Sequence, residues 1–98
     1  MTVPQTLVEN RDGALHLRGP LVFGSVGAAL TQSLALLPRQ GVAVIDMSDV
    51  AQADSAALAL LIEWRKFAAR QGLRLELRGV PAQLRALAAA AGLEALCA

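Results

Sequence analysis

The stretch that decides the fold is Ile45-Asp46-Met47-Ser48-Asp49-Val50-Ala51-Gln52-Ala53-Asp54-Ser55-Ala56-Ala57-Leu58. An apolar run over residues 42–45 ends at Asp46, a short polar segment follows, and Asp54-Ser55 opens a long apolar helix. This order predicts a strand, a loop and a helix N-terminus in one continuous piece. Free N–H groups and a partial positive charge at that N-terminus would favour a hydroxyl or a phosphate at Ser55. We interpret the stretch as a docking or switch site.

The sequence before this stretch predicts a hairpin and a helix. The turn signal Arg11-Asp12-Gly13 separates two short strands, residues 6–10 and 14–18. Gly19-Pro20 breaks the pattern, and residues 21–23 are a candidate further strand. A helix then opens at Ser25, its expected N-cap, and stops at Pro38. Its apolar residues at helical spacing are Val26, Leu30, Leu34 and Leu37.

The sequence after this stretch predicts a helix, a strand and a third helix. The long helix runs from Asp54 or Ser55 to about Gln71, where Gly72 stops it. Residues 73–78 alternate apolar with charged side chains, which is typical of a half-buried strand. The third helix has Pro81 at its first position and ends at Gly92. Beyond it, Leu93 and Leu96 are expected to fold back on the core.

The alternation of strands and helices implies parallel crossovers, and the opening hairpin makes the sheet mixed. We therefore expect a single α/β domain over residues 1–98, with a four- to five-stranded mixed sheet and about three helices packed on it. The unbroken apolar run at residues 42–45 predicts a central strand that is covered on both faces.

The composition narrows the classes of function. Hydrophobic residues make up 55% of the 98 residues and charged residues 17%, which excludes disorder and suggests a partner-binding face. A net charge of +1 does not suggest a nucleic-acid binder. No apolar run reaches the roughly 20 residues that span a bilayer. We expect a cytoplasmic protein that inserts into no membrane and reaches one only through a partner.

No set of residues points to catalysis. A metal or phosphoacceptor site is suggested by the three aspartates Asp46, Asp49 and Asp54. Such a site would also need an acidic pair after the first strand and a lysine at the end of a later strand, and the sequence has neither. His16 has no serine or cysteine partner at catalytic spacing, and Cys97 is the only cysteine. The glycines form neither a P-loop nor a dinucleotide fingerprint. We therefore expect no enzyme, no cofactor and no metal.

A helical wheel of the long helix places a mixed apolar and basic strip on one side. A broad arc of apolar residues, from Ala57 to Ala68, is its natural core contact. The strip comprises Ser55, Leu58, Ala59, Ile62 and Lys66. It is either a protein-docking surface or a surface that a loop covers. Ser55 is likewise either a simple N-cap or, if Asp54 caps the helix, a free hydroxyl.

The chain resembles the STAS domain family of sulphate transporters and anti-sigma factor antagonists. The resemblance rests on Asp46-Met47-Ser48, on Val50, and on Asp54-Ser55-Ala56-Ala57-Leu58, which match the family signature at a strand end and the following helix start. Residues 17–21 and 72–81 fit the same element order. The family glycine is replaced by Ala57, whose methyl group is expected to crowd the approach of a partner backbone.

Within this family the chain most resembles the MlaB-type subgroup, small STAS subunits of bacterial phospholipid-transport ABC systems. The likeness rests on residues 57–62 and 70–80 and on the short length. It implies docking on the transporter's ATPase, with Ser55 and its neighbour Asp54 at the contact and with Asp46 and Ser48 in a supporting loop. The alternative implied by the wider family is an anti-sigma factor antagonist, in which a serine kinase phosphorylates Ser55.

Overall fold

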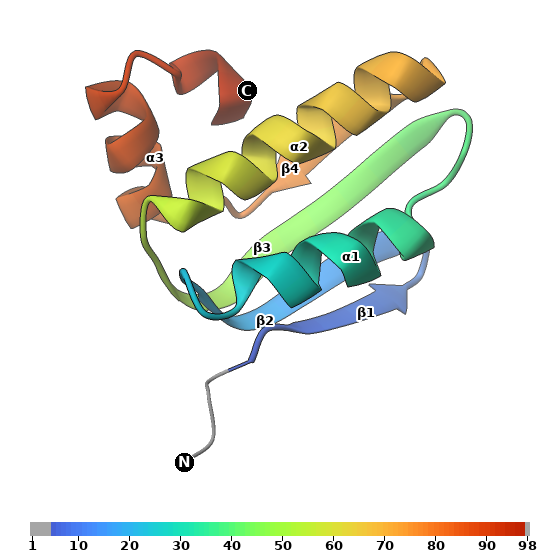
Figure 1. Cartoon of the computed structure of the whole chain (residues 1–98). Helices are drawn as coiled ribbons and strands as arrows, with labels where there is room; N and C mark the ends of the chain where they lie inside the picture. The colour runs from blue at the N-terminus through green and yellow to red at the C-terminus, as the bar shows by residue number, and fades with distance from the viewer. Residues whose placement is uncertain (1–4, 98) are drawn as a thin grey trace.

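A computed structural model describes residues 5–97 of the chain. Within them the chain forms four strands, three α-helices and a final 3-10 turn (Figure 1). The strands are β1 (Leu7–Arg11), β2 (Ala14–Leu21), β3 (Val42–Ala53) and β4 (Arg74–Arg78). The helices are α1 (Val26–Leu36), α2 (Ala56–Gln71), α3 (Ala82–Ala90) and the 3-10 turn η1 (Glu94–Cys97).

The strands form one mixed sheet in the order β1-β2-β3-β4. β1 and β2 pair antiparallel through a tight hairpin, in which Asp12 and Gly13 both have positive φ angles of 51° and 82°. β2, β3 and β4 pair parallel. The mixed α/β sheet, the hairpin and the parallel crossovers expected from the sequence are therefore confirmed.

The helices pack on one face of this sheet, and the other face is open (Figure 1). Side chains on the helix face of β3, such as Ile45 and Met47, are fully buried. On the opposite face, Val42 is 49% exposed and Val44 is half-buried. The prediction that residues 42–45 are covered on both faces is therefore wrong. Two consecutive right-handed crossovers in the same direction along the sheet place α1 and α2 on the same side.

Both central strands are longer than the sequence indicates. β3 continues through the polar residues after Asp46 to Ala53, because β2 pairs with it along that length. β2 in turn continues through Gly19 and Pro20 to Leu21, with register shifts in the pairing at this point. The expected loop after Asp46 and the expected separate strand at residues 21–23 are therefore both wrong.

Most helix boundaries are close to the predicted ones. α2 ends at Gln71, and Gly72 follows in the left-handed conformation with φ of 68°, as expected. Pro81 precedes α3 by one residue, and Leu93 and Leu96 pack against the core. In α1 the buried residues are Ala29 and Ser33, whereas Val26, Leu30 and Leu34 are only partly buried. No helix within residues 5–97 has the length and hydropathy needed to cross a bilayer.

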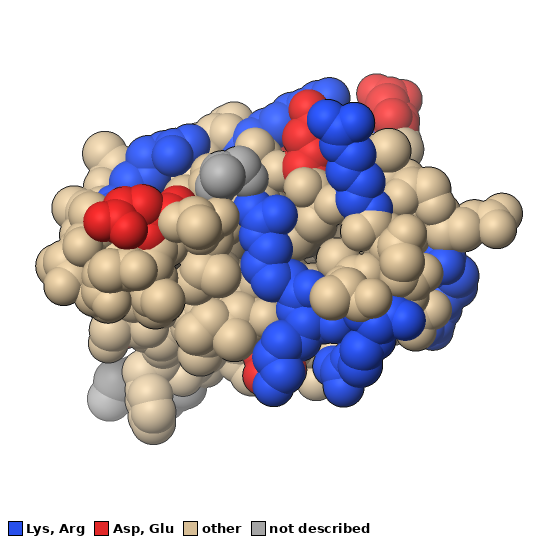
Figure 2. Space-filling model, turned by 90° about the horizontal axis from the view of Figure 1, so that it is seen from above, with Lys and Arg blue, Asp and Glu red and all other residues tan. Residues whose placement is uncertain are grey.

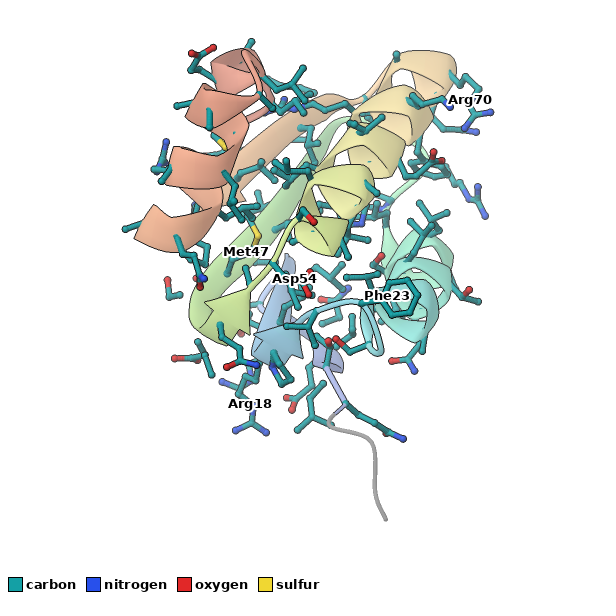
Figure 3. All side chains as sticks on the ribbon, turned by 60° about the vertical axis from the view of Figure 1, so that its left-hand side comes forward. Arg18, Phe23, Met47, Asp54 and Arg70 are labelled. Carbon is teal, nitrogen blue, oxygen red and sulfur yellow. The ribbon has the colours of Figure 1, made fainter. Side chains whose placement is uncertain are left out.

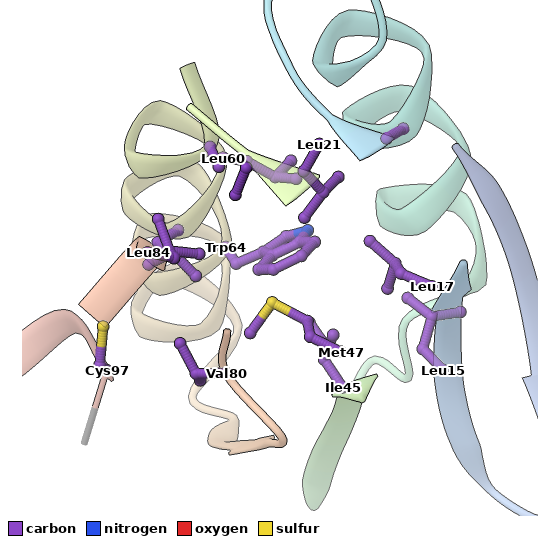
Figure 4. Close-up of a cluster of buried hydrophobic side chains, with 14 of the residues drawn as sticks. Leu15, Leu17, Leu21, Ile45, Met47, Leu60, Trp64, Val80, Leu84 and Cys97 are labelled. Atoms are coloured by element: carbon purple, nitrogen blue, oxygen red, sulfur yellow. The ribbon is translucent and has the colours of Figure 1, made fainter. Parts of the chain in front are cut away.

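Trp64 is the centre of the core (Figure 4). It is fully buried on α2, and strands β2 and β3 and helix α3 all contribute side chains to the same cluster. Its indole N–H donates a hydrogen bond of 2.9 Å to the hydroxyl of Ser33, which is also fully buried. This bond joins α2 to α1 inside the core and explains why a serine occupies the buried side of α1.

Replacing Ser33 by alanine should leave the Trp64 indole N–H buried without a partner. The expected cost is about 1–3 kcal/mol in the free energy of unfolding, measured by urea denaturation. Ser55→Ala is the matched control, because Ser55 is exposed and makes no cap hydrogen bond; its change should stay within about 0.5 kcal/mol. Equal effects of the two substitutions would contradict this role of Ser33.

Candidate partner-binding site

The carboxylate of Asp54 organises the start of α2. Its Oδ1 accepts the backbone N–H of Ala56 at 2.9 Å, and its Oδ2 accepts the backbone N–H of Phe23 at 3.1 Å. One carboxylate therefore satisfies a free N–H of the helix and also holds the loop between β2 and α1 beside it. Figure 3 shows Asp54 and Phe23 side by side. Of the two capping alternatives left open by the sequence, the structure selects Asp54.

Ser55 is consequently exposed, and its hydroxyl makes no cap hydrogen bond. It stands at the N-terminus of a 16-residue helix with no acidic residue in its first turn. Two residues later, Ala57 has no exposed surface. Its methyl group packs into the protein's own core, so the prediction that it crowds a partner is wrong.

The predicted strip on α2 lies at the surface, so a covering loop is excluded for residues 5–97. Ala59 is exposed, Ile62 is 36% exposed and Lys66 is exposed with its ammonium 3.5 Å from the carboxylate of Glu63. Leu58 is half-buried and packs partly against the core. We call the surface of Ser55, Leu58, Ala59, Ile62 and Lys66 the α2 strip.

Phe23 is not among the site residues predicted from the sequence, although it is the most exposed large apolar side chain within residues 5–97, at 87%. It lies in the loop after β2, where Asp54 binds its backbone. A shallow groove of about 90 Å³ runs between α1 and α2 near Ala59. Its lining residues are Val26, Gly27, Leu30, Ala59, Leu60 and Glu63. An apolar residue followed by Gly24-Ser25 is the sequence signal for an exposed loop that could have located Phe23.

Asp46 and Ser48, predicted to form a supporting loop beside Ser55, lie within β3. β3 continues for seven residues beyond Asp46, a distance of about 20 Å in an extended strand. Alternation with the buried Ile45 and Met47 places Asp46 on the open sheet face, away from the helices. The supporting role is therefore wrong, because the pairing of β3 with β2 extends the strand through the segment read as a loop.

On the open face, Asp46 belongs to a row of acidic and basic side chains across all four strands. The register aligns Glu9 with His16, His16 with Asp46, and Asp46 with Arg78. Hydrogen bonds from the Ser48 side chain and backbone hold the pKa of the Asp46 carboxyl below its ordinary value, and the charges of His16 and Arg78 act in the same direction. His16 Nδ1 lies 4.0 Å from Asp46. These side chains are readily solvated, so this face of the sheet can remain exposed to solvent.

A family model described as "Mlab, STAS domain" matches residues 7–98. The chain belongs to the STAS family. STAS domains are generally non-catalytic regulators, and the MlaB-like type expected from the sequence is the type that this model describes. A comparison with curated proteins finds no match.

Solved structures of the same fold agree with this assignment. An anti-sigma factor antagonist from Mycobacterium paratuberculosis is 25% identical with a TM-score of 0.62, over 95% of this chain and 81% of that one. Two structures described as Mglu are 27% and 22% identical, with TM-scores of 0.57 and 0.56. They match 79% and 74% of this chain, which spans only 20% and 23% of theirs. The structural likeness to an antagonist confirms the expected STAS fold.

Within residues 5–97, no group of three His, Cys, Asp or Glu side chains is placed to hold a metal ion. No hydroxyl or thiol of this part of the chain is hydrogen-bonded to His16, whose charged neighbour is Asp46. The geometry therefore offers surfaces for binding, not an arrangement of nucleophile and base.

Replacing Asp46 by asparagine should destabilise the protein at neutral pH. Because the folded-state pKa of Asp46 is lowered from 3.8, its stabilising contribution is present above that pH and is lost as the pH falls through the lowered value. Urea denaturation of both proteins at several pH values should show a difference that shrinks below pH 3.8. A difference that stays constant down to strongly acidic pH would contradict this cause.

Replacing Asp54 by alanine should remove both hydrogen bonds to the backbone. The expected cost is about 1 kcal/mol of stability, with faster amide hydrogen exchange at Phe23 and Ala56. Asp49→Ala is the matched control, because Asp49 is exposed on β3 and no ion pair or hydrogen bond joins its carboxylate to residues 5–97. Unchanged exchange at Phe23 in the Asp54 variant would contradict the link between loop and helix.

Proposed function

We propose that this protein is a non-enzymatic MlaB-like subunit that binds and regulates the cytoplasmic ATPase of a phospholipid ABC transporter. Such a transporter maintains the lipid asymmetry of the outer membrane. The family model of MlaB type over residues 7–98 supports the proposal. The observation that carries it is the exposed surface formed by Phe23 and the α2 strip on the helix layer. The protein would be cytoplasmic and peripheral to the inner membrane through this partner.

Apolar burial would supply most of the affinity. Covering a fully exposed phenylalanine contributes about 1.5–3 kcal/mol, and the backbone of Phe23 is held at the start of α2 by Asp54. Ala59 is shared by the groove and the α2 strip, so one partner element can contact both. A large aromatic anchor beside smaller contacts is the usual composition of an energetic hot spot.

Ser55 would make a polar contact at the centre of this surface. A phosphate on Ser55 would add a charge of about −2 beside the carboxylate of Asp54 and among apolar side chains. Docking should then weaken unless the partner supplies arginines. The ATPase would thus bind the unmodified protein.

The second candidate function is an anti-sigma factor antagonist switched by phosphorylation of Ser55. Two observations favour it, namely the exposed hydroxyl of Ser55 at a helix N-terminus and the structural likeness to the mycobacterial antagonist. Here the unmodified protein would bind a serine kinase that inhibits a sigma factor. Neighbouring genes distinguish the two functions, since a permease and an ATPase accompany the first and a kinase and a sigma factor the second.

The docking surface is tested by substitution at its two exposed apolar residues. Phe23→Ala should cost about 2 kcal/mol of binding, roughly a 30-fold rise in Kd for the ATPase, measured by biolayer interferometry. Ile62→Asp should cost at least as much, because it places a charge among apolar contacts. Ala89→Asp on the exposed side of α3 is the matched control and should bind normally.

Full binding by both the Phe23 and the Ile62 variants would contradict the docking surface. Incubation with the cognate kinase and ATP, read by mass spectrometry, tests the second function. An added phosphate on Ser55 would support the antagonist, and an unchanged mass would count against it.

A further inference from the structure

Charge is distributed unevenly over the molecule. Arg39 and residues 63–78 contain six of the nine Lys and Arg residues but two of the eight Asp and Glu residues, which gives a net charge of +4. The remainder of the chain therefore carries −3. Figure 2 shows Lys and Arg side chains gathered in a band across this side of the molecule, with few acidic side chains among them. The net charge of +1 conceals this separation.

Four exposed cations lie together where α2 ends. The guanidinium of Arg39 lies 5.6 Å from the ring centre of Phe67, one turn before the end of α2. The backbone N–H of Arg74 donates to the carbonyl of Gly41 at 3.0 Å, which joins the start of β4 to the loop that carries Arg39. We call this surface the basic end. Its members are Arg39, Lys66, Arg70 and Arg74.

Within residues 5–97, only one of the four cations of the basic end has a carboxylate partner, since the Lys66 ammonium lies 3.5 Å from the carboxylate of Glu63. No ion pair joins Arg39, Arg70 or Arg74 to a carboxylate within residues 5–97. Arg70 lies in the last turn of α2, where the partial negative charge of the helix stabilises one cation. Arg39 lies over the ring of Phe67, a contact that leaves its charge unpaired. The positive charge of these arginines is therefore available to an external anion.

The basic end continues the α2 strip. Lys66 belongs to both surfaces, and Arg70 follows it four residues later on the same side of the helix. Asp54 and Phe23 lie at one end of α2 and Arg70 at the other (Figure 3). A partner that covers the strip from Ser55 onward would therefore reach the basic end within the roughly 24 Å length of α2.

We propose that the basic end binds an acidic, extended segment of the same partner that docks on the α2 strip. The inference rests on the proposed function for the identity of that partner as the ATPase. Three guanidinium groups and one ammonium match the carboxylates of consecutive Asp and Glu side chains. The segment would fix how far along α2 the partner lies, while Phe23 and the strip supply the apolar contacts.

A lipid surface fits the basic end less well than an acidic segment. Peripheral membrane contacts combine cations with exposed aromatic anchors. The chain has no tyrosine, its single tryptophan is buried, and the exposed Phe23 lies at the other end of α2. The exposed large apolar residues nearest in sequence to Arg39 are Leu36 and Val42, which are 41% and 49% exposed. Neither is aromatic, so the basic end has no aromatic anchor of this kind beside Arg39.

The first test uses a labelled octaglutamate peptide and fluorescence anisotropy at low salt, and it is independent of the ATPase. The intact protein should bind the peptide, and the double substitution Arg70→Glu and Arg74→Glu should weaken binding at least about tenfold. The matched control is Arg85→Glu with Arg18→Glu, which reverses the same number of exposed charges elsewhere. Equal loss in both double variants would overturn the proposal.

The second test measures binding to the ATPase by biolayer interferometry at low and high salt. Reversal of Arg70 and Arg74 should slow association about tenfold and change dissociation less, because charges at an interface rim steer encounter. Unchanged association would overturn the proposal, even if Ile62→Asp abolishes docking and so supports the proposed function. If Ile62→Asp docks normally while reversal of Arg70 and Arg74 slows association, the result would support the basic end without supporting the α2 strip.

A sedimentation assay with anionic phosphatidylglycerol vesicles and neutral phosphatidylcholine vesicles tests whether the basic end binds a lipid surface instead. We expect that the protein sediments with neither kind of vesicle. If the anionic vesicles retain the protein and octaglutamate does not bind it, the basic end is a lipid contact and the acidic segment is wrong.

Discussion

The carboxylate of Asp54 is the constraint on which the proposed surface depends. It accepts hydrogen bonds from the start of α2 and from Phe23 in the loop after β2, which lies 31 residues before Asp54 in the sequence. Because Asp54 provides the cap, the hydroxyl of Ser55 faces outward without a cap bond. Because it also binds the backbone of Phe23, an exposed phenylalanine is held near the start of α2. A single residue thus fixes both the polar and the apolar part of the surface.

The two faces of the molecule have different physical properties. On the open sheet face, the carboxylates of Glu9 and Asp46 have basic side chains of the neighbouring strands beside them, so they need no external partner. On the helix layer, the α2 strip combines exposed apolar side chains with a basic end in which only Lys66 pairs with a carboxylate of residues 5–97, that of Glu63. This contrast places the expected contacts along α2 and leaves the sheet face to solvent.

Local signals in the sequence predict much of this fold. Gly72 ends α2 as expected, and the Asp12-Gly13 turn forms the hairpin, because positive φ angles favour these residues at those points. The length of β3 was not predictable, because its polar second half is extended only through pairing with β2. The α2 strip followed from helical periodicity. Gly24-Ser25 signals only the exposed loop that carries Phe23, whereas the place of Phe23 beside the start of α2 depends on a tertiary hydrogen bond to Asp54.

Hydrogen–deuterium exchange of the protein with and without the ATPase is the decisive test of the docking surface. We expect new protection in the complex at residues 22–30 and 54–66, which comprise the loop of Phe23, the groove and the α2 strip. Residues 14–18 and 42–46 on the open sheet face should exchange equally in both states. Protection confined to the open sheet face, with none along α2, would show that the partner docks elsewhere.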